Sequence, residues 1–214
     1  MNYKSYLIPG DLRIKGPSRM NRSGPAIFID LDGTLWPDLG PGTILENQSL
    51  VQYEIQISQI FSDLGYLLIG ITNQTLFGYE SKMKLPKVLK YRRRLKNIVE
   101  IFSFDSLFVC HHHPKSQIPF LRSSCPNRKP GIGSIQWAID IHNIDISKSF
   151  ILGDRITDML AGQEAGIPNR LLILNSRSLE WNEGEPFSNP KSIGFRTYRN
   201  LSEALKSIQL VIGA

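Results

Sequence analysis

Five short apolar runs recur along the chain, and stretches with helical periodicity lie between them. The runs span residues 26–31, 66–72, 106–110, 149–153 and 170–174. They are continuous rather than alternating, which is the pattern of strands buried on both faces of a parallel sheet. Strands that alternate with helices predict βαβ units. We therefore expect an α/β protein, a Rossmann-like three-layer α/β/α sandwich with a mainly parallel sheet.

Apolar residues spaced three and four apart predict the intervening helices. Helices are expected over 85–102, 132–142 and 156–165, and the last one stops at a Gly-Ile-Pro sequence. The remaining segments are expected to be a surface loop over 175–191, a strand near 193–197 and a helix near 201–210.

The length of the chain and its apolar content favour one globular domain. With 214 residues and 41% hydrophobic content, the chain can bury one sizeable core. No apolar stretch approaches the roughly 20 residues that a membrane span needs. Residues 1–24 lack the continuous apolar segment of a secretion signal. We expect a cytoplasmic monomer without a membrane segment, in which residues 1–24 are an N-terminal extension and residues 25–214 form the domain.

The charge balance favours anionic partners. Twenty-five Lys and Arg residues against 19 Asp and Glu residues give a net charge of +6, which suits a phosphorylated metabolite, a nucleic acid or an acidic protein. A basic stripe without acidic residues consists of Lys82, Lys84, Lys87, Lys90, Arg92, Arg93, Arg94 and Lys96. Two interpretations stay open for it, a contact surface for nucleic-acid phosphates and an ordinary solvated helix face.

Polar residues stand where the predicted strands end. Asp30 and Asp32 follow the first strand, residues 72–74 follow the second, and Asp154 follows the fourth. In open parallel sheets, ligands bind beyond the carboxyl ends of the strands. Two carboxylates beside a buried strand repel each other unless a cation or hydrogen bonds hold them. Oxygen ligands suit Mg²⁺, so we expect a magnesium site at this edge of the sheet.

Four segments together resemble the motifs of the haloacid-dehalogenase (HAD) superfamily phosphatases. They are DLDGT at 30–34, TNQ at 72–74, RKP at 128–130 and GDRITD at 153–158. Each segment alone could have a purely structural role, such as a capped turn for DLDGT. Only the four segments in this order indicate the superfamily. The resemblance implies a HAD-like fold. A large cap domain is not expected, because only 40 residues separate Asp32 from Thr72.

The resemblance also implies roles for the matching residues. Asp30 would be the nucleophile that accepts the phosphoryl group, and Asp32 would be the general acid and base. Mg²⁺ would be held by the carboxylates of Asp30 and Asp154 and by the carbonyl of Asp32. Thr72 and Lys129 would hold the oxygens of the phosphoryl group during transfer.

Five further residues complete the set that the resemblance supplies. Arg128 would recognise a second phosphate or sugar hydroxyls, because its planar guanidinium suits both. Asp38 matches an aspartate that helps to bind the sugar. Asn73 and Gln74 are expected to bind substrate, and Asp158 is expected to support the metal without binding it directly.

A loop rich in cysteine and histidine, residues 110–130, resembles that of one group within the superfamily. It is similar to the zinc-binding loop of the D-glycero-D-manno-heptose 1,7-bisphosphate phosphatases and the related histidinol-phosphate phosphatases. Cys110, His112 and Cys125 match three of the zinc ligands, and Asn127 stands where the family has a fourth, a cysteine. A neutral amide is a poor replacement for a thiolate. A weakened zinc site and a loop without zinc both stay open, with a flanking histidine or water as candidate fourth ligand.

These features predict a Mg²⁺-dependent phosphomonoesterase of carbohydrate metabolism. It would work through an aspartyl-phosphate intermediate on a small sugar phosphate such as heptose 1,7-bisphosphate. The alternatives within the superfamily are a histidinol-phosphate phosphatase and a polynucleotide 3′-phosphatase. An alternative of another class is a binding protein that keeps the HAD fold but has no catalytic activity.

Overall fold

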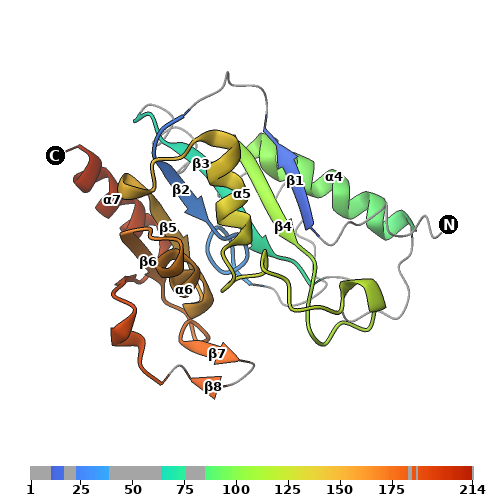
Figure 1. The fold of residues 1–214 in the computed structure, drawn as a ribbon. Coiled ribbons are helices and arrows are strands. Elements are labelled where there is room, and N and C mark those ends of the chain that lie inside the picture. The colour runs from blue at the N-terminus through green and yellow to red at the C-terminus, as the bar shows by residue number, and fades with distance from the viewer. Residues whose placement is uncertain are drawn as a thin grey trace.

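The computed structural model describes residues 11–16, 23–38, 64–75, 85–182, 185–186 and 188–213. Their main feature is a seven-stranded sheet with the strand order β1-β4-β3-β2-β5-β6-β9 (Figure 1). The strands are β1 (Asp11–Lys15), β2 (Ala26–Ile29), β3 (Leu67–Asn73), β4 (Ser106–Cys110), β5 (Phe150–Gly153), β6 (Asn169–Ile173) and β9 (Arg196–Tyr198). All neighbours pair in parallel except β1, which runs antiparallel to β4 at one edge. The mainly parallel sheet is thereby confirmed.

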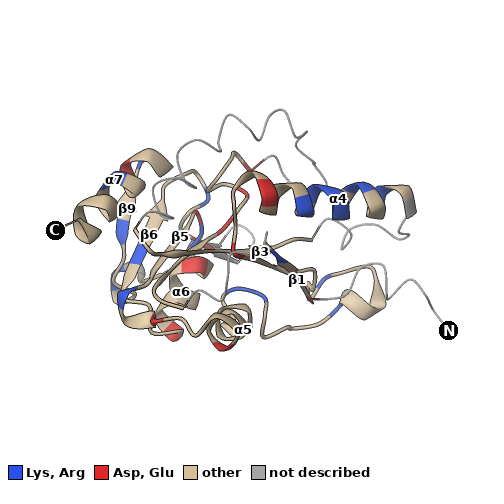
Figure 2. Ribbon diagram, turned by 90° about the horizontal axis from the view of Figure 1, so that it is seen from above, with Lys and Arg blue, Asp and Glu red and all other residues tan. Residues whose placement is uncertain are grey.

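Helices cover both faces of this sheet. They are α4 (Leu85–Ile101), α5 (Gly133–His142), α6 (Ile156–Glu164) and α7 (Leu201–Ile212). Figure 2 shows α4 and α7 on one side of the sheet and α5 and α6 on the other. Strand β2 serves both layers, because Ile27 and Ile29 pack with α4 and α7 while Ala26 and Phe28 pack with α5 and α6. The predicted three-layer α/β/α sandwich is confirmed.

Each of the five predicted apolar strands is present, and so are the predicted helices. The differences lie towards the C-terminus. The segment 175–191, expected as a loop, contains the short paired strands β7 (Glu180–Asn182) and β8 (Glu185–Pro186). The final strand, expected near 193–197, is β9 at Arg196–Tyr198. Short 3₁₀ turns lie at η1 (Pro119–Leu121), η2 (Ile146–Lys148) and η3 (Pro190–Ser192).

Strand β1 lies inside the segment that the sequence suggested as an N-terminal extension. Leu12 and Ile14 face the core beneath α4. Arg13 points to the other face, where Nε and Nη2 each donate to Ser106 Oγ at 3.1 Å. The guanidinium of Arg13 also lies 6.0 Å from the centre of the Phe108 ring. These contacts on both faces, together with the ladder to β4, hold the edge strand on the sheet.

The strand order brings three strand ends together. β2 is central and pairs with β3 on one side and with β5 on the other. The chain therefore leaves β2 towards one half of the sheet and later returns to the other half. At such a switch point the carboxyl ends of neighbouring strands leave an opening between their loops. The polar residues predicted for the site follow these three strands.

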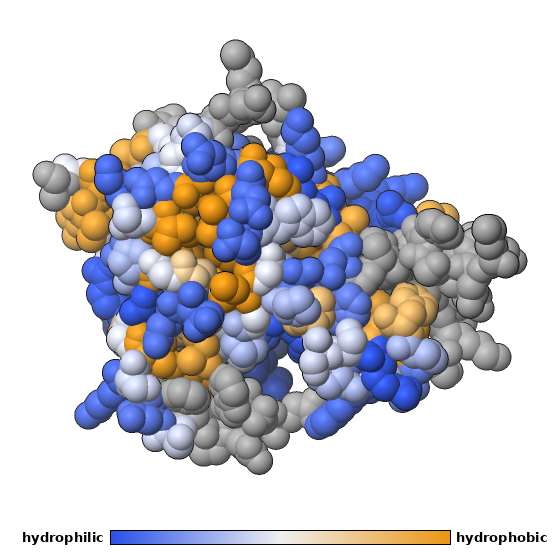
Figure 3. Space-filling view, viewed as in Figure 1, coloured by the Kyte–Doolittle hydropathy of each residue, from blue (hydrophilic) through white to orange (hydrophobic). Residues whose placement is uncertain are grey.

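The surface shown in Figure 3 mixes hydrophilic and apolar residues, and apolar residues gather on the face that carries α5. Trp137 and Ile141 of this helix are partly exposed. The ring of Trp137 meets the edge of the Phe108 ring, with 5.2 Å between the centroids. None of the described helices is long and apolar enough to span a membrane. The monomeric state stays a prediction.

Candidate active site

The site is built at the carboxyl ends of β2, β3 and β5. Asp30 is the first residue after β2, and its backbone N–H donates to the carbonyl of Leu152 in β5 at 3.0 Å. Thr72 belongs to the end of β3, and Asp154 directly follows β5. Main-chain pairing of the central strands therefore brings these three residues of separate motifs to one place.

Three buried carboxylates form the centre of the site. One oxygen each of Asp30, Asp154 and Asp158 lies within 4.8 Å of the others. We call these three residues the acidic centre. Lys129 is their buried counter-ion, because its Nζ lies 2.6 Å from Asp30 Oδ1 and 2.6 Å from Asp158 Oδ1. The same ammonium donates to the carbonyl of Ile71 at 2.9 Å. One ammonium thus faces three acidic side chains.

Burial and charge shift the protonation of these groups. Burial raises the pKa of Asp30 well above its ordinary value, although Lys129 opposes the shift. Burial and then the charge of Asp158 raise the pKa of Asp154 to about 6. Burial alone would lower the pKa of Lys129, but Asp158 and Asp30 outweigh it and the pKa is raised. The centre holds more negative charge than one ammonium neutralises, so a bound cation would stabilise it.

The acidic centre has the properties of a magnesium site. Among the described residues, Asp154 Oδ1 is buried and has no hydrogen-bond partner, whereas Oδ2 accepts from Asn175 Nδ2 at 2.8 Å. Gly33 leaves room beside it, since a Cβ there would lie 2.2 Å from Asp154 Oδ2 and the residue has a φ of +85°. An unpartnered carboxylate oxygen among other oxygen donors fits a hard divalent cation.

Asp32 lies at the rim of the acidic centre and is only partly buried. The indole N–H of Trp36 donates to Asp32 Oδ1 at 2.8 Å. Gln74 Nε2 donates to Asp32 Oδ2 and also to Thr72 Oγ1, the latter at 3.0 Å. Both oxygens of Asp32 are therefore oriented by neighbours. Its predicted part in metal binding, through the carbonyl, stays a prediction.

Asn73 holds the main chain of Lys129. Its Nδ2 donates to the Lys129 carbonyl at 3.0 Å, and its Oδ1 accepts from the Lys129 N–H at 3.0 Å. Both ends of the side-chain amide are thus used within the protein, as are the bonds of Gln74 described above. The two residues were predicted to bind substrate, and the contacts present in the structure position Lys129, Asp32 and Thr72.

Comparison with known proteins identifies the family to which the chain belongs. Residues 126–183 match the HAD-hydrolase-like family. The D-glycero-beta-D-manno-heptose-1,7-bisphosphate 7-phosphatase of Haemophilus ducreyi is 30% identical over 156 residues, which cover 72% of this chain and 85% of that protein. The chain belongs to the HAD-like hydrolases. Within this family it is a phosphatase, related to the heptose-bisphosphate 7-phosphatases.

Solved structures support the HAD-like fold. A provisionally assigned HAD-like phosphatase of Mesorhizobium loti superposes with a TM-score of 0.68 at 21% identity, covering 96% of this chain and 94% of that one. The D,D-heptose 1,7-bisphosphate phosphatase of B. bronchiseptica gives a TM-score of 0.60 at 18% identity, covering 89% and 99%. That protein was solved in complex with magnesium and phosphate.

Asp158 has two contacts in this HAD phosphatase. Besides Lys129, it accepts a hydrogen bond from the backbone N–H of Arg155 at 3.0 Å, which caps the start of α6. Gly153 allows this approach, because a Cβ there would lie 2.3 Å from Asp158 Cγ. An oxygen of Asp158 lies within 4.8 Å of oxygens of Asp30 and Asp154, and its role in supporting the metal stays a prediction.

Arg155 is a site residue that the sequence reasoning did not assign. Its Nη2 lies 3.2 Å from Asp38 Oδ2, and its other nitrogens lie 3.5 Å from Asp154 Oδ2 and 3.5 Å from Glu180 Oε2. The exposed Asp38 is therefore connected to the acidic centre by a guanidinium. Arg155 lies within the GDRITD motif. The motif predicted that this segment belongs to the site, but it predicted no role for Arg155.

A second cluster lies where β1 and β4 meet. Cys110, His112 and Cys125 are brought together as predicted, and Asp11 joins them, so that one ligand atom from each residue lies within 4.8 Å of the others. We call these four residues the thiol cluster. Both cysteines are free thiols, and burial raises the pKa of Cys110. Asp11 was not foreseen, because nothing in the local sequence marks it as a ligand.

The residues considered earlier for a fourth ligand have other contacts. His111 is buried on the α4 side, where its Nε2 and the Tyr91 hydroxyl are 3.1 Å apart. His113 Nδ1 accepts from the backbone N–H of Lys115 at 3.1 Å. Neither histidine belongs to the thiol cluster. The fourth ligand-type side chain of the cluster is the carboxylate of Asp11.

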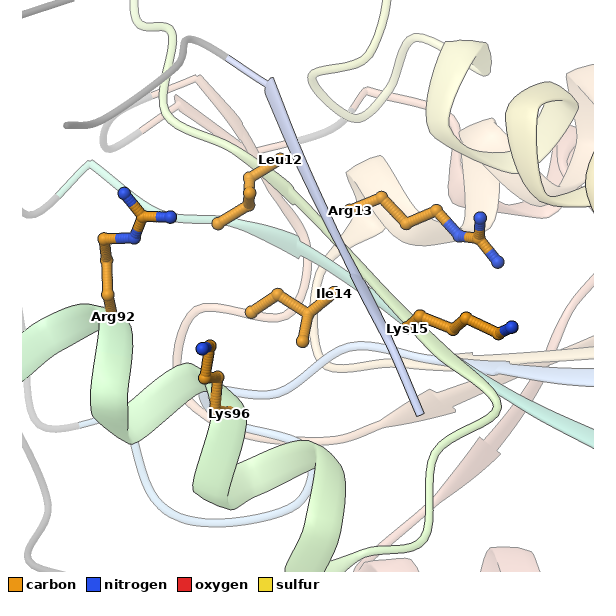
Figure 4. A pocket seen from close by; sticks show the side chains of 6 residues that line it. All are labelled: Leu12, Arg13, Ile14, Lys15, Arg92 and Lys96. Atoms are coloured by element: carbon orange, nitrogen blue, oxygen red, sulfur yellow. The ribbon is translucent and has the colours of Figure 1, made fainter. Parts of the chain in front are cut away.

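The basic stripe is divided by the fold. Arg94 is buried, with its guanidinium 5.9 Å from the centre of the Trp36 ring. Lys and Arg residues remain concentrated along α4 (Figure 2), and Arg92 and Lys96 line a groove beside β1 (Figure 4). Leu12 and Ile14 project towards these two residues in Figure 4. Lys82 and Lys84 lie outside the described residues, as does most of the segment in which a cap domain was considered.

Proposed function

We propose that this HAD phosphatase is a Mg²⁺-dependent phosphomonoesterase that acts on a small sugar phosphate through an aspartyl-phosphate at Asp30. The observation that supports this proposal is the acidic centre at the switch point of the sheet, with Lys129 as the one ammonium that contacts it among the described residues. Uncatalysed hydrolysis of phosphate monoesters is so slow that enzymes accelerate it by up to about 10²¹-fold. Positioned charges of this kind are what such a reaction requires.

The first half-reaction uses two aspartates in different environments. An oxygen of Asp30 attacks phosphorus, the bond between phosphorus and the sugar oxygen breaks, and Asp32 gives its proton to that leaving oxygen. Asp30 is buried beside Lys129, whereas Asp32 stands at the rim, oriented by Trp36 and Gln74. The rim position leaves Asp32 close to the leaving alcohol and to solvent.

The second half-reaction returns the enzyme to its starting state. The carboxylate of Asp32 takes a proton from a water molecule, which attacks phosphorus and releases inorganic phosphate from Asp30. Lys129 and the hydroxyl of Thr72 hold the phosphoryl oxygens in both steps. Asn73 keeps Lys129 in place through its two main-chain hydrogen bonds.

Asp30 and Asp154, with the Asp32 carbonyl, would hold the magnesium ion. When bound, Mg²⁺ neutralises the repulsion between the anionic nucleophile and the anionic phosphate. The unpartnered Asp154 Oδ1 and the room left by Gly33 support this assignment. The magnesium and phosphate in the B. bronchiseptica relative are consistent with it.

The proposed substrate class follows from the relatives and from the residues at the rim. The Haemophilus ducreyi relative acts on a heptose bisphosphate. Asp38 is exposed beside Arg155 and could accept hydrogen bonds from sugar hydroxyls. Arg128 directly precedes Lys129 and is partly buried, with Nη1 donating to the carbonyl of His112 at 3.1 Å. We propose that Asp38 and Arg128 bind the sugar and its second phosphate.

A substrate screen tests the proposal. Phosphate release would be measured with and without Mg²⁺ on heptose 1,7-bisphosphate, histidinol phosphate, a 3′-phosphorylated oligonucleotide and p-nitrophenyl phosphate. We expect Mg²⁺-dependent turnover that is highest with the heptose bisphosphate. The oligonucleotide is included because of the basic groove beside β1.

Two variants make the result interpretable. Asp30→Asn should abolish release from every substrate, whereas Asp140→Asn, a matched change at an exposed aspartate, should have no effect. If the unaltered chain released no phosphate from any of the four compounds with Mg²⁺, the proposed function would be wrong and the binding-protein alternative would be favoured.

A further inference from the structure

The thiol cluster receives one of its members from an unexpected element. β1 and β4 are antiparallel with Asp11 directly opposite Cys110. Directly opposed residues of two strands point their side chains to the same face of the sheet. His112 lies two residues beyond Cys110, and Cys125 returns to the same place at the end of the loop. Strand register, rather than a local motif, therefore brings the carboxylate to the two thiols and the imidazole.

The separations within the cluster are those of ligands around one ion. Cys110 Sγ lies 3.7 Å from His112 Nδ1, Cys125 Sγ lies 3.5 Å from both carboxylate oxygens of Asp11, and His112 Nδ1 lies 3.4 Å from Asp11 Oδ1. In a tetrahedral zinc site, sulfur stands about 3.6 Å from a nitrogen or oxygen ligand, and nitrogen about 3.3 Å from oxygen. The three kinds of pair agree with this geometry to within a few tenths of an ångström.

We propose that Asp11 is the fourth ligand of a zinc ion held together with Cys110, His112 and Cys125. The asparagine at the position of the family's last cysteine is then no defect, because the edge strand supplies the missing donor. Asn127 itself is directed elsewhere, since its Oδ1 lies 2.1 Å from the position of a Cβ on Gly133 at the start of α5.

The donor types select the metal. Two thiolates and an imidazole favour zinc over magnesium, and carboxylate oxygen is an established zinc ligand at about 2.0–2.2 Å. Four protein ligands close the tetrahedron, which is the form of a structural rather than a catalytic zinc site. This inference does not depend on the proposed phosphatase substrate, because none of the four residues belongs to the acidic centre.

The ion would link three segments that are distant in the sequence. It would join β1 to the end of β4 and to the loop that closes at Cys125. That loop continues into Arg128 and Lys129, and Arg128 already donates to the carbonyl of His112 at 3.1 Å. Zinc would thereby stabilise both the edge strand and the segment that carries the ammonium of the active site.

Zinc binding by the full chain tests the role of Asp11. We expect about one zinc per chain by elemental analysis, and Asp11→Ala should weaken zinc binding at least about 100-fold in competition with a chelator, since even the loss of a residue that only supports a ligand costs about 10- to 100-fold. Asp140→Ala and Asn127→Ala are matched controls that should bind zinc like the unaltered chain. Equal affinity of Asp11→Ala and the unaltered chain, or no zinc in the unaltered chain, would overturn the proposal.

A gain-of-ligand variant covers the case in which Asp11→Ala does not fold. Asp11→Cys should bind zinc more tightly than the unaltered chain. With Co²⁺ in place of zinc, its thiolate-to-cobalt absorption should increase as the third thiolate joins the two of the unaltered site. An unchanged cobalt spectrum would mean that residue 11 does not face the ion. Hydrogen exchange supplies a further readout, because zinc should slow exchange of the β1 amides.

Discussion

The acidic centre takes its side chains from the ends of central parallel strands and the helix that follows, whereas the thiol cluster lies where an antiparallel edge strand meets the sheet. The first consists of carboxylates around one ammonium, and the second combines two thiols, an imidazole and a carboxylate. Their donor atoms suit different metals, Mg²⁺ for the oxygen donors and zinc for the sulfur and nitrogen donors. If both metals bind as proposed, one sheet would keep a reactive and a structural metal apart through donor chemistry and position.

The two regions also differ in what they require from the protein. The acidic centre depends on charges that repel each other, so it should be strained without a cation. The thiol cluster depends on strand register, so it should stabilise the edge strand when metal binds. Substitutions in the acidic centre should therefore leave zinc binding intact, and this can be measured.

Replacing Lys129 should have the largest effect. Lys129→Met removes the only ammonium that contacts Asp30 and Asp158 within the described part of the chain, leaving these buried carboxylates without their counter-ion. We expect kcat/KM for p-nitrophenyl phosphate to fall by about 10³-fold or more. The free energy of unfolding should fall by about 3–5 kcal/mol, which urea denaturation would measure.

The control for this variant is Lys148→Met, because Lys148 is exposed on the surface. It should change neither kcat/KM nor the unfolding midpoint. Zinc content should stay at about one per chain in both variants. Loss of zinc from Lys129→Met would show that the two regions are not independent.

Asp154→Asn should separate metal binding from the stability of the protein. Mg²⁺ affinity should fall at least about 100-fold, because a direct ligand loses its charge. The pKa of Asp154 is raised to about 6, so at neutral pH its ionised form destabilises the metal-free fold. The neutral amide removes this penalty, and the metal-free variant should melt at a higher temperature than the unaltered chain.

Thermal melting with and without Mg²⁺ checks both halves of the Asp154 prediction. The unaltered chain should gain stability on adding Mg²⁺, and Asp154→Asn should not. A variant that still responded to Mg²⁺ like the unaltered chain would contradict the assignment of Asp154 as a ligand. Zinc affinity should be the same in both proteins.

The pH dependence of Mg²⁺ binding should show the same carboxylate. A proton competes with the metal for Asp154, so Mg²⁺ affinity should fall by about tenfold per unit as the pH drops below about 6. The raised pKa acts in the opposite direction without metal: the stability contributed by protonated Asp154 is present below its ordinary value of 3.8 and is lost as the pH rises through about 6.

Isothermal titration between pH 5 and pH 8 would measure the Mg²⁺ affinity. Asp154→Asn should remove the dependence associated with this group. A Mg²⁺ affinity that stayed constant down to pH 5 would mean that the Asp154 carboxylate does not bind the metal.

The difference between the two regions also explains what the sequence could reveal. Asp30, Thr72 and Asp154 each directly end or follow an apolar run, so strand prediction and the topology of parallel sheets were enough to bring them together. Cys110, His112 and Cys125 were recognised because their loop resembles the zinc-binding loop of the heptose-bisphosphate phosphatases. Asp11 could not be, because it enters through an antiparallel pairing with Cys110, and the five residues of β1 lie in a segment broken by glycine and proline.

Finer roles within the site depend on side-chain contacts that no pattern encodes. Asn73 was expected to bind substrate, and in the structure its amide makes one donated and one accepted hydrogen bond with the Lys129 main chain. Arg155 lay inside a recognised motif, yet its contact with Asp38 requires loops from β2 and β5 to meet. Arg94 belonged to a basic stripe, but the fold buries it against Trp36. In each case the contacts of the side chain depend on tertiary packing, which the residue type alone does not predict.

Replacing Asn73 should have the smallest effect, and it tests the segment that joins the two regions. Asn73→Ala removes two hydrogen bonds to Lys129, each contributing about 0.5–1.5 kcal/mol, so the unfolding free energy should fall by about 1–3 kcal/mol. The looser Lys129 should lower kcat/KM by about tenfold while zinc affinity stays unchanged.

The matched control is Asn169→Ala at the start of β6, because Asn169 also makes two side-chain hydrogen bonds, to Ser149 and Arg196. It should lower stability, though less, since its bonds are longer at 3.3 and 3.4 Å, and should leave kcat/KM unchanged. If both variants lost the same activity, the effect of Asn73 would be general destabilisation. A loss of activity confined to Asn73→Ala would instead show that this side chain positions the ammonium, because both variants would lose stability but only one would lose activity.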